Sequence, residues 1–401
     1  MKHKQAATVF ILVTVLIDVI GFGIIIPVVP ALIMDLTSGT VSEASSWGGY
    51  LLGVYAIMQF FFSPILGGLS DRYGRRPVLL IALFGLGIDY FIASLAPSLA
   101  WLFLARVIAG IGGASFTTAS AYIADVSSPD RRAQNFGYIG AAFGLGFIIG
   151  PVIGGVLGQY GPRVPFIAAG ILTLLNWLYG YFIVPESLPA EKRRDFSWKR
   201  ANPIGTLKQL TIHPVIFGLV ISMFFVYIAA HATQSTWTYY TIERYDWSEA
   251  QVGYSLGFVG FMIALVQGFV VKLFVARFGQ KTSVYAGLLF NALGLTLIAF
   301  ATEGWMLYAM MVPYALGGLA GPNLQGIMTS QVPDNEQGEL QGGLTSLASL
   351  TSIIGPFLMT AIFAYFTSTG APIYLPGAPF ILGGALALFA TLIAWRTLSR
   401  M

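Results

Sequence analysis

Long apolar runs, separated by short polar segments, make up most of the chain. Twelve of these runs reach the length of about 20 mainly apolar residues that a helix needs to cross a lipid bilayer. The pattern therefore predicts an all-α membrane protein with twelve transmembrane helices, embedded in a lipid bilayer. The runs lie at residues 6–34, 47–68, 77–96, 98–124, 133–158, 165–185, 213–240, 248–275, 282–301, 304–327, 338–366 and 376–398.

The longest polar segment lies between the sixth and the seventh run. It covers residues 186–212 and contains a dense group of acids and bases. We interpret it as a linker between an N-terminal half, residues 1–185, and a C-terminal half, residues 213–401, with six helices each.

Two sequence markers suggest that the halves are copies of one unit. Gly74 in "RYGRRP" and Gly279 in "RFGQKT" are 205 residues apart, and the same distance separates the Gly-Pro pairs at 150–151 and 355–356. Gly-Pro pairs recur easily in a glycine-rich chain, so the offset supports a repeat without establishing one. Paired repeats are typical of transporters that hold their substrate at the repeat interface.

The composition agrees with a membrane protein. Only 9% of the residues are charged and the mean hydropathy is +0.76, whereas a soluble domain has roughly 25% charged residues. The absence of cysteine excludes disulfides, thiolate nucleophiles and cysteine-based metal sites. The first apolar run is too long for a cleavable signal peptide and contains Asp18, so we interpret it as the first spanning helix.

Basic residues indicate how the chain is oriented. An even number of spans places both termini on one side, and 18 of the 21 Lys and Arg residues fall on that side. The positive-inside rule therefore predicts that both termini and the linker are cytoplasmic. Since topology explains the basic residues, the net charge of +4 gives no reason to expect a nucleic-acid partner.

Residues 67–77, "GGLSDRYGRRP", concentrate one acid and three arginines between the second and third predicted helices. One interpretation is that the arginines only hold this loop in the cytoplasm. The pattern contains more than positive charge, because an acid precedes the basic cluster and two glycines allow close helix contact. Gly74 and Pro77 predict a tight turn followed by a new helix.

This loop is similar to the signature loop between helices 2 and 3 of the major facilitator superfamily. Residues 106–114, "RVIAGIGGA", resemble the superfamily's helix-4 motif, and residues 137–155, "GYIGAAFGLGFIIGPVIGG", resemble the helix-5 motif of its drug:proton antiporters. With "LLGVYAIMQ" at 51–59 and "IDY" at 88–90, the chain most resembles the tetracycline/proton antiporters. The resemblance implies two pseudo-symmetric six-helix bundles in the major facilitator fold.

The resemblance also implies a gate on the cytoplasmic side. Asp71 would face the start of helix 11 near Gly338, and Arg75 or Arg76 would pair with Asp125 at the end of helix 4. An interfacial ion pair has modest energy and is able to break in each transport cycle. We therefore expect Asp71→Asn to slow transport.

Three ionisable residues, Asp18, Asp89 and Arg106, lie deep within predicted spans. A charge inside a membrane is costly and marks a functional site by default. The resemblance implies proton coupling by both acids, with Arg106 adjusting Asp18. We predict that Asp18 is the main proton carrier and that Asp89 handles substrate or protons. The alternative is a buried ion pair, such as Asp18 with Arg106, that only fixes packing.

The fifth predicted helix contains glycines at positions 140, 144, 150 and 154, in pairs spaced four apart that permit close backbone approach. Ordinary tight packing is an alternative explanation. The resemblance implies that Gly144, Gly150 and Pro151 contribute to a gate or hinge on the outward side, where this helix meets helix 8.

Polar and aromatic side chains within the spans are candidates for lining a substrate cavity, although an interhelical hydrogen bond is the alternative for each. They are Tyr55, Gln59, His231, Gln234, Trp237, Asn291 and Gln325. Asn291 and Ile263 stand where the tetracycline exporters have an acid and a histidine, which puts recognition of a tetracycline–magnesium chelate in question. A broader or different drug-like substrate is the alternative.

Signatures of enzymes and ATP-driven pumps are missing from the sequence, including a Walker A loop and a zinc-protease motif. We therefore expect no enzyme activity, no cofactor and no bound metal. We predict a monomeric, proton-coupled antiporter that exports lipophilic drug-like compounds across a bacterial-type inner membrane by alternating access. The alternatives are a proton-coupled importer of a small nutrient and a non-transporting membrane receptor or partner protein.

Overall fold

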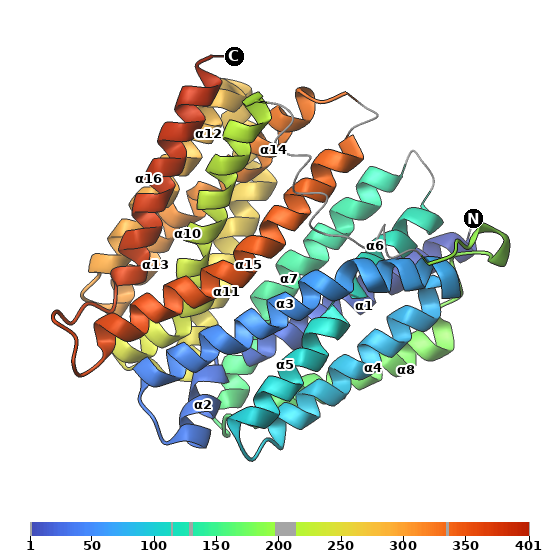
Figure 1. Ribbon diagram of the computed structural model, residues 1–401, viewed down its shortest axis with the longest axis horizontal. Helices are drawn as coiled ribbons and strands as arrows, with labels where there is room; N and C mark the ends of the chain where they lie inside the picture. The colour runs from blue at the N-terminus through green and yellow to red at the C-terminus, as the bar shows by residue number, and fades with distance from the viewer. Residues whose placement is uncertain (1, 114, 128–130, 197–213, 334–336, 401) are drawn as a thin grey trace. The chain divides into compact units, whose positions relative to one another are not determined.

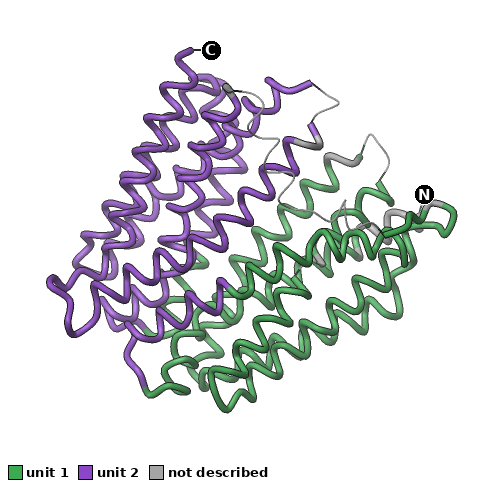
Figure 2. The backbone as a smooth tube through the Cα atoms, viewed as in Figure 1, with its two compact units in different colours: residues 1–38, 54–202, 248–257 green, residues 39–53, 203–247, 258–401 purple. Residues whose placement is uncertain are grey.

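The computed structural model describes residues 2–113, 115–127, 131–196, 214–333 and 337–400, and their regular structure is helical (Figure 1). The chain divides into two compact units (Figure 2). Unit 1 comprises residues 1–38, 54–202 and 248–257, and unit 2 comprises residues 39–53, 203–247 and 258–401. The predicted linker is described only as far as residue 196, with one 3₁₀ turn, Ala190–Lys192.

Unit 1 is built mainly from the helices of the first part of the chain. They are α1 (Lys2–Ile25), α2 (Val29–Thr37), most of α3 (Val41–Tyr73), α4 (Arg75–Ser94), α5 (Leu99–Gly113), α6 (Ser115–Val126), α7 (Arg132–Gly158) and α8 (Val164–Ile183). α1 packs against α7 and α8, and α4 packs against α5 and α8. Apolar side chains of α1, α4, α6 and α7, among them Ile11, Leu83 and Ile123, form a buried core.

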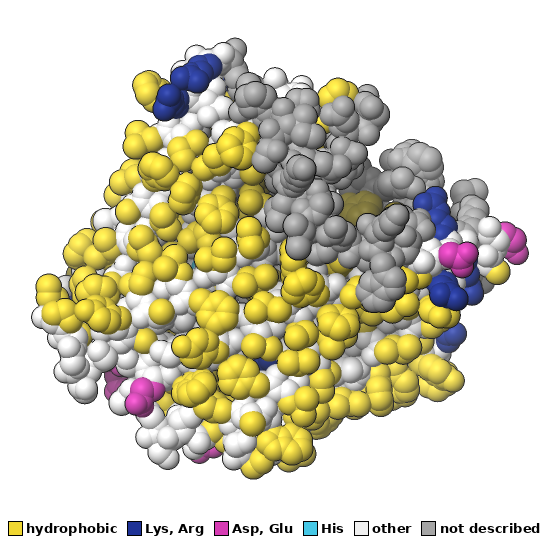
Figure 3. All heavy atoms as spheres, viewed as in Figure 1, with side chains coloured by type: hydrophobic (Ala, Val, Ile, Leu, Met, Phe, Trp, Pro, Cys, Tyr) yellow, Lys and Arg dark blue, Asp and Glu magenta, His cyan; other side chains and the backbone are white. Residues whose placement is uncertain are grey.

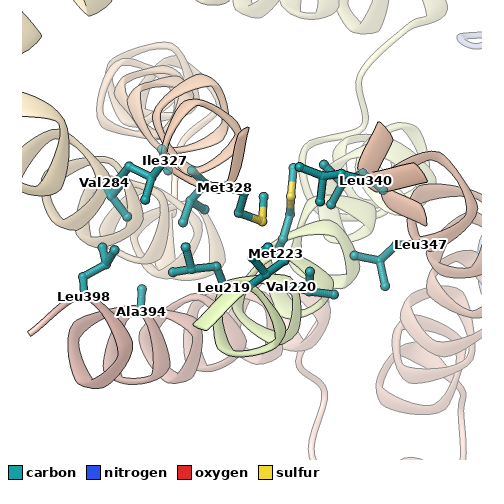
Figure 4. Close-up of a cluster of buried hydrophobic side chains, with 14 of the residues drawn as sticks. Leu219, Val220, Met223, Val284, Ile327, Met328, Leu340, Leu347, Ala394 and Leu398 are labelled. Atoms are coloured by element: carbon teal, nitrogen blue, oxygen red, sulfur yellow. The ribbon is translucent and has the colours of Figure 1, made fainter. Parts of the chain in front are cut away.

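Unit 2 is built mainly from the later helices. They are α10 (Pro214–Tyr245), the end of α11 (Glu249–Leu265), a π-helical turn (Val266–Val270), α12 (Val271–Phe300), α13 (Gly304–Leu316), a 3₁₀ turn (Gly317–Leu319), α14 (Ala320–Ser330), α15 (Gln337–Thr367) and α16 (Ala378–Leu398). α10 packs against α15 and α16, and α12 packs against α13 and α16. Figure 4 shows a buried core of this unit, in which Met223 of α10 and Met328 of α14 lie among leucine and valine side chains.

Two helices run from one unit to the other. The first part of α3, up to Gly53, belongs to unit 2, and the first part of α11, up to Gly257, belongs to unit 1. Glycine permits this packing in unit 2, because a Cβ on Gly48 or Gly53 would overlap the ring of Tyr239 or Phe357. The predicted halves assign both segments differently, and that division by sequence repeat stays a prediction.

Nine helices of the described residues are long and apolar enough to cross a membrane, and the bent pair α1–α2 raises the number to ten. One of the nine, Glu249–Phe300, is long enough for two spans, and Gly279 within it has a non-helical backbone between two predicted spans. The 3₁₀ turn at Gly317–Leu319 divides another predicted span into α13 and α14, which are each too short to count. The helices are thus consistent with twelve spans.

The first predicted span, residues 6–34, is broken in the structure. α1 ends at Ile25 and α2 begins at Val29, with a bend of 45° between them. Pro27 and Pro30 account for the break, because a proline inside a helix removes a backbone donor and clashes with the preceding turn.

The backbone supports the internal repeat at both markers. Gly74 and Gly279 have φ angles of 104° and 79°, which favour glycine, and each separates two consecutive helical segments. The two Gly-Pro pairs both lie inside long helices, α7 and α15. These helices pack against the first helix of each half, α1 and α10 respectively. Local conformation and helix pairing therefore repeat together with the sequence.

Apolar side chains cover the visible sides of the helices, while most charged side chains visible in the view lie near helix ends (Figure 3). Ile81, Leu95, Phe182 and Leu273 are each more than 70% exposed. Such extensive apolar exposure is unfavourable in water and favourable in hydrocarbon. The chain is a multi-pass membrane protein.

Candidate functional site

Arg75 is the centre of a charged cluster in the loop after α3. Its Nε lies 3.1 Å from Asp125 Oδ2 at the end of α6, and its Nη1 lies 2.5 Å from Asp71 Oδ1. The same Nη1 donates to Ser70 Oγ at 2.6 Å. The sequence left open which arginine pairs with Asp125, and the structure selects Arg75. It also shows that this one guanidinium binds both predicted acids.

Arg76 has a different environment. Its Nη2 donates to the backbone oxygen of Tyr181 at 2.6 Å, and its guanidinium lies 5.8 Å from the centre of the Tyr181 ring. Since Tyr181 is in the last turns of α8, Arg76 joins the start of α4 to the end of α8.

Glu186 is a member of this cluster that the sequence analysis missed. Its carboxylate accepts hydrogen bonds from the backbone N–H groups of Arg75 at 2.8 Å and Arg76 at 3.3 Å, which are the first residues of α4. It also accepts from the N–H groups of Ser187 and Leu188, both at 3.0 Å. The side chain therefore caps α4 and shapes the turn after α8.

The position of Glu186 explains why no pattern indicated its role. A helix cap is normally sought immediately before the helix, whereas Glu186 lies 111 residues beyond Arg75. The only available signal was an acid directly after Pro185, at the end of an apolar run.

Asp89 and Arg106 form an ion pair inside unit 1. Arg106 Nη2 lies 2.9 Å from Asp89 Oδ2 and 3.2 Å from Oδ1. The Asp89 side chain is 1% exposed and that of Arg106 is 13% exposed, so the pair joins α4 to α5 away from the surface. A buried charge of this kind is tolerated only with a close partner.

Asp18 of α1 makes no hydrogen bond or ion pair with any residue that the structure describes. It is nevertheless close to the pair, because Asp18, Asp89 and Arg106 all act electrostatically on the hydroxyl groups of Tyr55 and Tyr90. The structure thus brings the three predicted ionisable residues together. It pairs Arg106 with Asp89. The packing alternative had named a pair of Arg106 with Asp18, and the described residues do not form that pair.

Two of the candidate cavity residues lie beside this group in unit 1. Gln59 Nε2 lies 3.4 Å from the Tyr55 hydroxyl and donates to the backbone oxygen of Gly113 at 3.3 Å. Gln59 therefore makes an interhelical hydrogen bond from α3 to α5, the alternative named for it, whereas its contact with Tyr55 lies within α3.

The glycines of α7 fall into two groups. A Cβ on Gly150 would come within 2.8 Å of the Gly23 Cα, and a Cβ on Gly154 would overlap the backbone of Ile24. Gly140 and Gly144 have no atom within 4 Å of such a Cβ. The glycines that pack closely therefore lie in the second half of α7, and Gly144 is not one of them.

The same part of α7 also contacts the start of α11 within unit 1. A Cβ on Gly253 would overlap the backbone oxygen of Pro151, and one on Gly257 would lie 2.6 Å from Val152 Cγ2. The expected meeting of helix 5 with helix 8 is present, while its role as a gate stays a prediction.

Three candidates of unit 2 are buried or partly buried. His231 is 8% exposed, and its Nδ1 has no hydrogen-bond partner among the described residues. Trp237 is 4% exposed and packs edge-on against Phe380 of α16, with ring centres 6.2 Å apart. Asn291 has an amide oxygen without a partner in the described part of the chain.

The other two candidates of unit 2 are exposed. Gln325 donates to Gln341 Oε1 at 2.8 Å, and Gln234 lies on an exposed part of α10. The predicted substrate residues therefore divide between the units, with Tyr55 and Gln59 in unit 1 and the other five in unit 2. A cavity shared by all of them stays a prediction.

Within the described ranges, no three His, Cys, Asp or Glu side chains lie close enough together to hold a metal ion.

The fold matches solved structures of membrane transporters. The crystal structure of a bacterial homologue of the human lysosomal transporter Spinster has a TM-score of 0.77. It is 16% identical in sequence, and the match covers 99% of this chain and 98% of that chain. At this identity the likeness defines the fold alone.

The family follows from sequence comparison. The Major Facilitator Superfamily model matches residues 11–274 and 243–400. The Escherichia coli tetracycline resistance protein of class C is 41% identical over 393 residues, which are 96% of this chain and 98% of the relative. The class B protein of Escherichia coli is 35% identical over 364 residues, covering 90% of this chain and 89% of the relative. The chain therefore belongs to the Major Facilitator Superfamily, in the group that contains the tetracycline resistance proteins.

Proposed function

We propose that this protein is a proton-coupled antiporter that exports tetracycline-type or other lipophilic drug-like compounds by alternating access. The observation that carries the proposal is the group of ionisable side chains inside unit 1. Asp89 is neutralised by Arg106 at 2.9 Å, whereas Asp18 has no ionic partner in the described chain. The names of its relatives, tetracycline resistance proteins, supply the substrate class.

Asp18 is the proton carrier in this proposal. An unpaired carboxyl group in an apolar span is stable with a proton bound and costly without one. Release of that proton is therefore linked to a change in its surroundings, such as entry of substrate or reorientation of Arg106. Asp89 and Arg106 form a fixed ion pair nearby, and its charges adjust how readily Asp18 releases its proton.

The Arg75 cluster is the gate in this proposal. Arg75 binds Asp71 and Asp125 at the same time, so loss of either acid leaves the guanidinium with one remaining ionic partner. Asp71 is the more exposed of the two acids, with 41% of its side chain accessible, and is the partner able to exchange. Its contact with the start of α15 near Gly338 remains part of the proposal.

The substrate is a lipophilic compound, and recognition of a magnesium chelate is the less favoured version. Asn291 has an uncharged amide with an unpaired oxygen where the tetracycline exporters have an acid. A neutral amide binds a hydrogen-bond donor more readily than a divalent cation. We therefore rank lipophilic drugs without a bound metal above a magnesium chelate as the substrate class.

The proposal includes a location and an assembly. The protein acts as a monomer in a bacterial-type inner membrane, with both termini in the cytoplasm. It binds protons and a small-molecule substrate, has no nucleic-acid partner and catalyses no chemical reaction.

Transport in proteoliposomes tests the function. An imposed pH gradient should drive accumulation of tetracycline against its own gradient, with protons moving in the opposite direction. Asp18→Asn should abolish this accumulation, whereas Asp35→Asn, an exposed acid at the end of α2, should not. Movement of tetracycline in the same direction as protons would overturn export. Accumulation by Asp18→Asn at the wild-type rate would overturn the role of Asp18.

A further inference from the structure

Unpartnered polar atoms are concentrated between α1 and α8. Among the described residues, seven buried side-chain nitrogen or oxygen atoms have no hydrogen-bond partner. Three of the seven are Thr14 Oγ1, Thr173 Oγ1 and Asn176 Oδ1, whose residues are at most 2% exposed. A buried polar atom without a partner costs about 1–3 kcal/mol, so three on one pair of packed helices require a physical explanation. We call Thr14, Thr173 and Asn176 the α1–α8 seam.

The seam is tied to Asp18 through the backbone of α1. Asn176 Nδ2 donates to the backbone oxygen of Thr14 at 3.1 Å. In an α-helix that oxygen also accepts the backbone N–H of the residue four positions later, which is Asp18. Asn176 is therefore fixed beside the backbone of α1, one helical turn before Asp18.

The other end of the seam lies one turn beyond Asp18. Gly21 shares a helix face with Thr14 and Asp18, because these positions are three and four residues apart. A Cβ on Gly21 would lie 3.3 Å from Thr173 Oγ1 and 3.5 Å from the Tyr90 hydroxyl. Thr173 Oγ1 of α8 and the Tyr90 hydroxyl of α4 thus lie beside α1 one turn after Asp18. They fit there because Gly21 has no side chain.

The charged and titratable groups near Asp18 come from other directions. Asp18, Asp89 of α4 and Arg106 of α5 all act electrostatically on the hydroxyl groups of Tyr55 of α3 and Tyr90 of α4. α8 contains no Asp, Glu, Lys, Arg or His, α7 contains only Arg132, its first residue, and α6 contains Asp125, which is paired with Arg75. Thr173 and Asn176, which α8 places along this face of α1, are neutral.

We propose that the α1–α8 seam binds internal water and that Asp18 exchanges its proton through this water. This proposal rests on the proton coupling proposed above. A buried water needs two to four polar partners; Thr173 Oγ1 and the Tyr90 hydroxyl, beside Gly21, form one pair of partners, and Thr14 Oγ1 and Asn176 Oδ1, two turns away along α1, form another. The carboxyl group of Asp18 gives one proton to the water and becomes a carboxylate. That water releases one proton in turn to the water outside the protein, so Asp18 loses one proton and bulk water gains one, while the seam groups hold the internal water in place. Thr173 and Asn176 are positioning residues in this step.

Two substitutions remove the seam while keeping the size of each side chain. Thr173→Val and Asn176→Leu should each slow tetracycline uptake driven by a pH gradient about tenfold, the effect of about one lost hydrogen bond. They should also shift the pH profile of uptake. Counterflow of labelled tetracycline at equal pH on both sides should be unchanged, because exchange of substrate for substrate moves no net proton. Thr118→Val is the matched control, since it removes another buried unpartnered hydroxyl, on α6, and should change neither reaction.

Each outcome of this experiment decides the question. Equal slowing of driven uptake and counterflow would show that the seam residues have a merely structural role, and would overturn the seam proposal. No change in either reaction would overturn it as well. Wild-type protein that performs counterflow but no gradient-driven uptake would refute proton coupling itself, and the seam proposal would fall with it.

Infrared difference spectroscopy supplies a readout that needs no transported substrate. A pH step should change the carboxyl band that Asp18→Asn removes, together with water O–H bands that shift in H₂¹⁸O. Thr173→Val and Asn176→Leu should remove those water bands and leave a folded protein with the Asp18 band displaced. Unaltered water bands in both variants would overturn the proposal.

Discussion

At the scale of single residues, the pairing of Asp89 with Arg106 is the contact most sensitive to substitution. Arg106→Ala leaves a fully buried carboxylate without its partner at 2.9 Å, which should lower the free energy of unfolding by about 3 kcal/mol. The double variant Asp89→Asn/Arg106→Gln should recover most of this loss, because neither buried charge remains. Equilibrium unfolding in mixed micelles measures both values. Equal losses in the single and double variants would show that the pair contributes nothing beyond its individual side chains.

Glu186 permits a second prediction at this scale. Glu186→Ala removes the acceptor of the first N–H groups of α4 and should destabilise the protein by about 1 kcal/mol. It should also speed trypsin cleavage after Arg75, since α4 would fray at its start; the bond after Arg76 precedes Pro77 and resists trypsin. Glu186→Gln keeps an acceptor oxygen and should have a smaller effect.

Glu191→Ala is the control for this prediction, because it removes a nearby exposed acid that caps no helix in the described chain. Cleavage of Glu186→Ala at the same rate as Glu191→Ala would contradict the capping role.

The ion pair of Asp89 with Arg106 and the cap formed by Glu186 show which parts of a site can be predicted from a sequence. Acids and an arginine inside apolar runs are visible by type alone, because charge is rare there. Which acid the arginine binds depends on the angle between α4 and α5, and the sequence contains no signal for that angle. The role of Glu186 depends on hydrogen bonds from backbone N–H groups far away in the chain. Every residue type except proline has such a group, so the residue types give no signal for these bonds.

At the scale of helices, the packing of α1 against α7 depends on backbone contact. Gly154→Ala places a Cβ against the Ile24 backbone, with its Cα 2.8 Å away, and backbone has no alternative rotamer. We expect a loss of about 2–3 kcal/mol in the free energy of unfolding. Gly140→Ala, on the same helix with no atom within 4 Å, should instead stabilise the protein by up to about 1 kcal/mol. Thermal unfolding of the two variants in detergent tests the contrast, and equal shifts would contradict it.

Helix boundaries were predictable where glycine and proline lie in a charged loop and were missed where proline lies inside an apolar run. Gly74 was recognised as a turn from its neighbours, and the structure confirms it with a φ of 104°. The bend near Pro27 was missed, because the apolar run continues through it without a polar residue. Hydropathy registers burial in lipid and not the direction of the helix axis, so a bent span and a straight one have the same pattern.

At the scale of the whole molecule, basic residues predict the orientation, and one exception now has an explanation. Arg163 lies on the side with few basic residues. Its Nη1 donates to the backbone oxygens of Ser94 at 2.8 Å and Ala96 at 2.9 Å, at the end of α4. Its Nη2 lies 3.4 Å from Asp35 Oδ2. A cation that binds the last carbonyl groups of a helix is stabilised there by the helix dipole. Arg163 therefore serves local structure and is no argument against the predicted topology.

The absence of cysteine permits a direct test of that topology. Ser368 and Ser399 are both exposed, and each hydroxyl donates to a backbone oxygen three residues earlier in its own helix end. The predicted orientation places residue 368 outside and residue 399 in the cytoplasm. A membrane-impermeant maleimide should therefore label Ser368→Cys in intact cells and Ser399→Cys only after the membrane is opened. Because the unmodified chain has no thiol to react, the label reports the single introduced site. Labelling of Ser399→Cys in intact cells would reverse the orientation, and with it the direction in which the proposed pH gradient drives the substrate.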